Sequence, residues 1–280
     1  MAAHDTGRAW ALSIGLCRNR RLHFLPSHRT IDSMKSQYFG DLTDYRKYGL
    51  LRCLSANGEI KTGVCWMLTE GVGWVSTEHE TEGASKFQYL TEPEHWRHFD
   101  PDLFDFLRAQ IKKDRRSVDC IETAVLLPCT TFFSQPLASN YQDRRNYFKR
   151  ALEFFADRDL IFFDPDNGLT NSISMSSRHS NKYLYHDELA KAFKTGVSVL
   201  VFQYSMTEDQ EERAEYLARQ LQKLAGAPST ILFNSPTGMY FLLPQGAKWD
   251  YFWRRAEMIV HSWPGHLRWQ NIRRRMGVER

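Results

Sequence analysis

The stretch that most constrains the fold of this chain is a short apolar run that ends on a polar turn. Leu160-Ile161-Phe162-Phe163 is followed directly by Asp164-Pro165-Asp166-Asn167-Gly168. An apolar run of this length, bounded by Pro and Gly, predicts a short buried strand that stops abruptly. Pro165 stiffens the turn because its φ is fixed, and Gly168 permits a positive φ. The strand therefore delivers two carboxylates and an amide to its C-terminal end, where ligands bind in open α/β sheets.

The same turn also has a purely structural interpretation. Asp and Asn side chains often bond their own backbone in a polar turn. Three polar groups within four residues at a strand end favour a working site over that alternative.

Short apolar runs and helical patterns alternate along the rest of the chain. This alternation predicts an α/β fold with a doubly wound, mostly parallel sheet and helices on both faces. The last two runs predict an antiparallel hairpin at the C-terminal end of the sheet. The expected strands are 63–68, 117–127, 160–163, 197–202, 229–233 and 238–243. The expected helices are 41–57, 101–113, 144–155, one that starts near 182–189, 208–224 and 249–261.

The domain organisation is expected to be simple. The chain has 280 residues, enough for one large domain or two small ones. Helical and strand periodicity is lost before Met34, so we expect residues 1–33 to be a poorly ordered basic extension. Residues 34–263 are expected to form a single α/β domain and 264–280 a basic C-terminal tail. Residues 1–33 carry +3 and 248–280 carry +5. Such basic ends could touch nucleic acid, although solvated tails would look the same.

Composition excludes several classes of protein. No apolar stretch approaches the ~20 residues that span a bilayer. The five cysteines are odd in number and widely spaced, which argues for reduced thiols and against a disulfide framework or a zinc site. We therefore expect a cytoplasmic protein without a membrane span.

Two further segments carry candidate residues. Asp41, Asp44 and Lys47 project from one side of the expected first helix, either as a cap with a salt bridge or as a charged pocket wall. Glu70, Gly71 and Gly73 follow the first expected strand, where a glycine pair can let backbone approach a nucleotide.

These motifs support a family comparison. Tyr-Phe-Gly-Asp at 38–41 with its continuation to Arg52, and Phe-Phe-Asp-Pro-Asp-Asn-Gly-Leu at 162–169, resemble an uncharacterised bacterial group that shares both motifs. The strand with Asp-Pro-Asp-Asn is similar to the Asp-Pro-Pro-Tyr motif of adenine-N6 methyltransferases, with Asp166 in place of the second proline and Asn167 in place of the aromatic residue. Segment 38–48 is similar in placement to the N-terminal Gly-Asn-x-x-Asp-x-x-Lys-His segment of ribosomal RNA adenine-N6 methyltransferases. The sheet resembles the Rossmann-like class I S-adenosylmethionine-dependent methyltransferase fold.

The resemblance implies an S-adenosylmethionine-dependent methyltransferase-like protein that acts on an amino group of a nucleic acid or a related substrate. In this interpretation Asp164 and the Pro165 carbonyl accept hydrogen bonds from the acceptor amine, which orients its lone pair toward the methyl group. The acceptor site would be Asp164, Pro165, Asp166 and Asn167. Cofactor-binding residues would be Asp41, Asp44, Lys47, Glu70, Gly71 and Gly73. Substrate-binding residues would be Lys182 and Gln203, with Gln203 closing the pocket.

Two other functions stay open on the sequence alone. A phosphoester hydrolase or nuclease could bind Mg²⁺ through Asp164, Asp166 and Asp187 or Glu188, and could neutralise phosphate with Lys47, Lys182 or Arg178. A non-catalytic binding module on a methyltransferase fold is the third reading. Two of the candidate residues, Asp164 and Gln203, directly follow apolar runs. Together with Asp44 they should converge on one pocket at the carboxyl edge of the sheet, where ligands collect.

Overall fold

The computed structural model describes residues 38–69, 86–204 and 210–273. These residues form an α/β structure around a seven-stranded sheet with the order β2-β1-β3-β6-β8-β7-β9. The strands are β1 (Thr62–Cys65), β2 (Thr130–Phe133), β3 (Leu160–Phe163), β6 (Ser198–Tyr204), β7 (Ser229–Ser235), β8 (Gly238–Leu243) and β9 (Arg268–Arg273). A separate two-stranded parallel sheet joins β4 (Leu169–Thr170) to β5 (Leu184–Tyr185).

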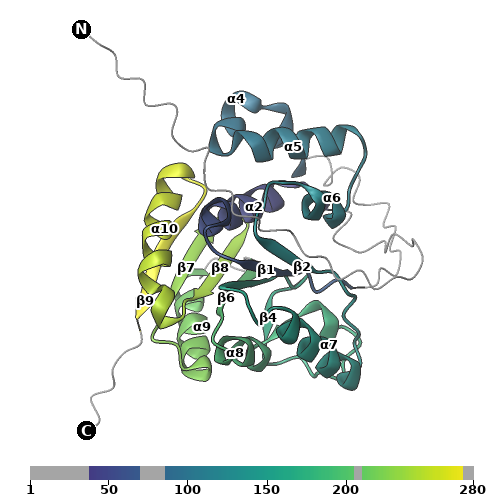
Figure 1. Cartoon of the computed structure of the whole chain (residues 1–280), viewed down its shortest axis with the longest axis vertical. Helices are drawn as coiled ribbons and strands as arrows, with labels where there is room; N and C mark the ends of the chain where they lie inside the picture. The colour runs from purple at the N-terminus through teal and green to yellow at the C-terminus, as the bar shows by residue number, and fades with distance from the viewer. Residues whose placement is uncertain (1–37, 70–85, 205–209, 274–280) are drawn as a thin grey trace.

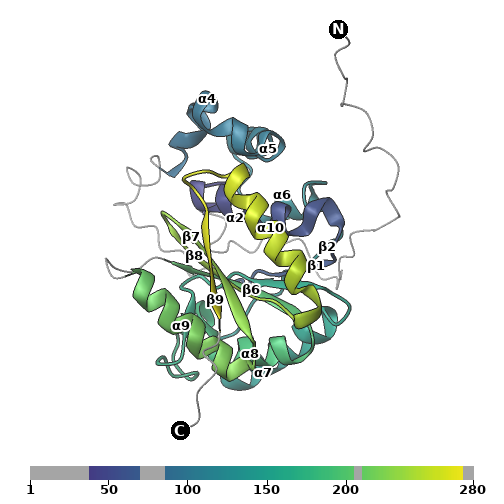
Figure 2. The same ribbon diagram turned by 90° about the vertical axis from the view of Figure 1, so that its left-hand side faces the viewer.

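Helices cover both faces of the large sheet (Figures 1 and 2). On one face lie α2 (Leu42–Ser55), α5 (Pro101–Lys112), α6 (Val118–Thr123) and α10 (Trp249–Ser262). On the other lie α7 (Tyr141–Phe154), α8 (His186–Lys194) and α9 (Gln210–Ala225). Short helices complete the chain: η1 (Ala56–Gly58), η2 (Gln88–Thr91), α4 (Pro93–Trp96), η3 (Arg97–Phe99), η4 (Ser180–Lys182) and η5 (Gly246–Lys248).

The central strands are apolar on both sides because each face packs against helices. Leu160 and Phe162 of β3 belong to the core beneath α2, whereas Ile161 and Phe163 belong to the core beneath α7 and α8. Successive strand residues point to opposite faces, so a continuous apolar run is what a doubly covered strand requires. The expected α/β class, the mostly parallel sheet and the two helical layers are therefore confirmed.

The C-terminal end of the sheet differs from the expected hairpin. β7 and β8 pair antiparallel, but β8 lies between β6 and β7 within the main sheet. β9 then pairs antiparallel with β7 at the outer edge. Residues 268–273, expected to belong to a basic tail, are thus an edge strand, and the hairpin is not a terminal element.

One expected strand is a helix. Residues 117–127 were expected to be extended, yet they contain α6, and the neighbouring strand β2 begins only at Thr130. Ser117 caps α6 by accepting a hydrogen bond from the Asp119 amide. Val118, Ile121 and Glu122 are buried at helical spacing.

No helix within the described ranges is long and apolar enough to cross a membrane.

Candidate functional site

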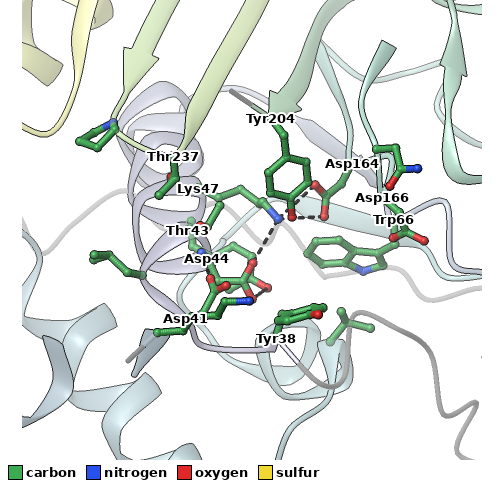
Figure 3. A pocket seen from close by; sticks show the side chains of 16 residues that line it. Tyr38, Asp41, Thr43, Asp44, Lys47, Trp66, Asp164, Asp166, Tyr204 and Thr237 are labelled. Carbon is green, nitrogen blue, oxygen red and sulfur yellow. Dashed lines mark hydrogen bonds and ion pairs between the residues drawn. The ribbon is translucent and has the colours of Figure 1, made fainter. Parts of the chain in front are cut away.

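A cavity of about 820 Å³ lies where the carboxyl ends of β1, β3 and β6 face α2. Its volume falls in the range of small-molecule sites. Charged side chains are prominent among the residues that line it (Figure 3). Four carboxylates and two ammonium groups line it: Asp41, Asp44, Asp164, Asp166, Lys47 and Lys86.

The centre of the cavity is a buried Asp–Lys–Asp bridge. The Lys47 Nζ lies 3.1 Å from the Asp44 Oδ1 and 3.1 Å from both carboxylate oxygens of Asp164 (Figure 3). Asp164 is only 2 % exposed and Lys47 only 6 %. Burial would lower the pKa of Lys47, but the carboxylates of Asp164 and Asp44 outweigh it and hold that pKa well above its usual value. Lys47 is therefore a charged, fixed donor that positions Asp164.

The N-terminus of α2 organises the other half of the bridge. Asp41 caps the helix by accepting a hydrogen bond from the Asp44 amide at 2.8 Å. Asp44 in turn accepts from the Gly40 amide at 3.0 Å and from the Tyr48 hydroxyl at 3.2 Å. Burial and the neighbouring charge of Asp44 raise the pKa of Asp41 to about 7. Both interpretations of this segment therefore hold, because the residues of the helix cap and the salt bridge also form a wall of the cavity.

The turn after β3 places its polar residues as the sequence predicted. Asp164 extends the β1–β3 pairing, because its amide donates to the Cys65 carbonyl at 3.1 Å. Asp166 accepts a hydrogen bond from the Thr69 hydroxyl at 2.8 Å. Asn167 lines the cavity, and its amide donates to the Lys182 carbonyl at 2.8 Å. Asp164 and Asp44 thus converge on one pocket at the carboxyl edge.

Gln203 does not line this cavity, contrary to expectation. Its Oε1 accepts a hydrogen bond from the Leu169 amide at 2.7 Å, so it holds the chain that follows the turn. Gly168 fits against it with φ +86°, and a Cβ there would lie 2.4 Å from Gln203 Oε1. The neighbouring Tyr204 lines the cavity instead. Strand alternation explains the exchange, because Tyr204 shares a face with Phe202 and Gln203 points to the opposite face.

Lys182 also holds the turn after β3 in place. Its backbone carbonyl anchors Asn167, and Lys182 is not among the residues that line the cavity. The other expected cofactor residues, Glu70, Gly71 and Gly73, lie outside the described residues.

The alternative metal set is not assembled. Asp187 lines a second hollow, beside α8 and α9, whereas Asp164 and Asp166 line the first. Glu188 forms a buried ion pair with Arg144, at 2.6 Å between its Oε1 and the Arg144 Nε. Among the described residues, no group of three or more His, Cys, Asp or Glu could hold a metal ion. These donors therefore do not fit the Mg²⁺ site of the hydrolase reading.

The candidate residues from the sequence included no aromatic side chain, yet four line the cavity: Tyr38, Tyr48, Trp66 and Tyr204. Trp66, directly after β1, forms part of the cavity floor, and its Nε1 donates to the buried Glu122 Oε1 at 2.7 Å. Tyr204 is 40 % exposed, and its hydroxyl points toward Asp164 and Lys47 (Figure 3). Burial raises the pKa of Tyr204, so its hydroxyl stays protonated near neutral pH. Trp66 directly follows β1 and Tyr204 is the last residue of β6, and that position at a strand end was the signal that could have found them.

Comparison with known proteins adds little. No family model and no curated protein matches the chain. A search of solved structures returns protein LPL1258 from Legionella pneumophila str. Philadelphia 1, described by the family model DUF519. It is 12 % identical, with a TM-score of 0.37, over 85 % of this chain and 98 % of that one. A similarity of this size carries no argument about the fold or the site.

Proposed function

We propose that this protein is an S-adenosylmethionine-dependent methyltransferase that acts on an amino group. The observation that supports the proposal most is the buried carboxylate of Asp164 in a cavity with four carboxylates at the carboxyl end of a central parallel strand. Such a cavity attracts cationic ligands and hydrogen-bond donors, and it repels phosphate groups.

The cavity suits the proposed cofactor in charge and in size. When bound, S-adenosylmethionine would supply a methyl group on a positively charged sulfonium. Asp41 and Asp44 are the described residues of the predicted set that would hold its cationic groups. The Asp164 turn resembles the Asp-Pro-Pro-Tyr motif. We therefore assign the acceptor amine to the Asp164 side of the cavity, opposite the cofactor.

The residues of the turn would then orient the acceptor. Each carboxylate oxygen has two lone pairs, so Asp164 can accept a hydrogen bond from an amine while Lys47 remains bound. The Pro165 carbonyl would accept a second one. Fixed acceptors of this kind aim the nitrogen lone pair without reorganisation during the reaction. As the nitrogen gains its fourth bond, Asp164 is placed to take up the proton that the amine releases.

Tyr204 would provide the flat surface that Asn167 cannot. Its ring is part-exposed and stands beside Asp164 in the cavity. Enzymes that act on a base commonly stack it against an aromatic or apolar side chain. We assign this role to Tyr204, from the strand next to the one that carries the motif.

Titration calorimetry with S-adenosylmethionine, S-adenosylhomocysteine and Mg²⁺ tests the proposal. We expect both adenosyl compounds to bind one site per chain without added metal. Binding of Mg²⁺ alone would revive the hydrolase alternative. Absence of binding by all three would leave the binding-module alternative.

A further inference from the structure

A strongly basic ridge lies at the end of α5, outside the acidic cavity. Residues 108–116 hold five basic residues and one acid, a net charge of +4. Lys112, Lys113, Arg115 and Arg116 are exposed and Arg108 is half-buried. Within the described part of the chain, only Arg116 of these five forms an ion pair, with the exposed Asp114 at 3.4 Å. Among the described residues, Asp114 is thus the only ion-pair partner of the ridge, which otherwise presents positive charge.

The ridge borders an apolar hollow. A hollow of about 330 Å³ lies between η2 and α5, with Phe87, Leu90 and Ile111 in its lining and Arg108 and Lys112 beside them. The Arg116 guanidinium lies 4.9 Å from the centre of the Phe87 ring. Aromatic rings interleaved with Arg and Lys are the usual means of holding single-stranded nucleic acid, because bases stack while cations hold phosphates.

Neighbouring residues of the chain line the hollow and the acidic cavity. Lys86 lines the acidic cavity, and its Nζ lies 4.4 Å from the centre of the Tyr38 ring in the same cavity wall. The next residue, Phe87, lines the hollow. A strand held on the ridge would therefore have a neighbouring nucleotide at the mouth of the cavity.

We propose that this basic ridge, defined as Arg108, Lys112, Lys113, Arg115 and Arg116, binds the phosphates of a single-stranded polynucleotide whose base amino group enters the acidic cavity. The inference rests on the proposed function and names its substrate class. The separation of charges supports it, since the carboxylates of the cavity exclude phosphate while the ridge attracts it. A single strand fits because Asp164 is 2 % exposed, and a base paired in a duplex could not reach it.

Fluorescence anisotropy with labelled 12-nucleotide single-stranded RNA and DNA of the same mixed sequence tests this inference. We expect the wild-type chain to bind and K112E/R116E to bind at least 10-fold more weakly. The slope of log affinity against log salt should become shallower by about 1.4, because each phosphate contact on a single strand contributes about 0.7. The RNA and DNA arms show which backbone is preferred.

The matched control is K149E/R150E, which reverses two exposed charges on α7, across the sheet from α5. We expect it to bind the oligonucleotides as the wild type does. Equal losses in the two double variants, an unchanged affinity of K112E/R116E, or no binding by the wild type at low salt would each overturn the inference. Titration of the same variants with S-adenosylmethionine separates the two proposals. Ridge-dependent binding without cofactor binding would reject the methyltransferase and keep the ridge, and the converse result would reject only the ridge.

Discussion

At the scale of single residues, the arrangement of the site depends most on the side chain of Lys47. It lies between the carboxylates of Asp44 and Asp164, whose buried charges would be costly without a cation beside them. Sequence analysis placed Asp44, Lys47 and Asp164 in the site, because helix spacing and strand ends are visible in the sequence. It could not show that Lys47 contacts Asp164, which lies 117 positions further along the chain.

Lys47→Met should destabilise the fold by about 3 kcal/mol or more at pH 8, because it leaves Asp44 and Asp164 buried without their cation. The two carboxyl groups would then have raised pKa values in the folded variant. Stability relative to the unfolded chain is lost as pH rises through a raised folded-state pKa, so the deficit should shrink at pH 5. Urea unfolding at both pH values measures it, with Lys191→Met on the exposed face of α8 as the control. A Lys47→Met variant as stable as the wild type at pH 8 would show that Lys47 does not compensate the buried charges of Asp44 and Asp164.

Asp41→Asn tests the raised pKa at the start of α2. A carboxyl group with a folded-state pKa of about 7 and an unfolded value of about 4 stabilises the fold below pH 4, and this contribution is lost as pH rises through 7. Asn caps a helix as well as Asp does, so the substitution removes the titration and keeps the cap. From pH 5 to pH 8, the free energy of unfolding of the variant should rise relative to that of the wild type by at least about 1 kcal/mol.

Asp250→Asn is the control for this pH dependence, since Asp250 is exposed in the first turn of α10. We expect its difference from the wild type to be the same at both pH values. Parallel pH curves for Asp41→Asn and the wild type would contradict the raised pKa.

At the scale of elements, the sequence predicted best where both faces of an element are buried. β3 and β6 were recognised because continuous apolar runs leave few alternatives. β9 was missed because an edge strand needs no apolar alternation, and Ile272 is its one fully covered residue. α6 was mistaken for a strand because its few apolar residues fit either periodicity, and a six-residue helix makes fewer than two turns.

Gly168→Ala should destabilise the fold by about 2 kcal/mol and disturb the Asp164 turn. The residue has φ +86°, and a Cβ would lie 2.4 Å from Gln203 Oε1. Gly196→Ala is a matched control, because Gly196 has φ +91° but no atom within 4 Å of the added Cβ. Thermal unfolding of both variants separates backbone strain from the clash. Gln203→Ala combined with Gly168→Ala should recover the part due to the clash, and equal losses in the two glycine variants would refute the packing role of Gln203.

At the scale of the whole molecule, the order of the strands could not be derived from the sequence. Alternating strands and helices predict parallel pairing, but the position of β8 between β6 and β7 depends on contacts between distant segments. That arrangement leaves the carboxyl ends of β1, β3 and β6 together beneath α2, where the acidic cavity lies. The chain between β1 and β2 carries Lys86, which lines the cavity, and α5, whose basic residues border the hollow.

The most direct test of the central claim is transfer of a labelled methyl group from S-adenosylmethionine to single-stranded RNA and DNA by the wild type and Asp164→Asn. We expect the wild type to label one of the two and Asp164→Asn to lose at least ~100-fold in rate with unchanged cofactor affinity, because the carboxylate orients the acceptor amine. Asp187→Asn, in the second hollow, should retain the wild-type rate. Transfer by Asp164→Asn at the wild-type rate, or none by the wild type, would contradict the claim.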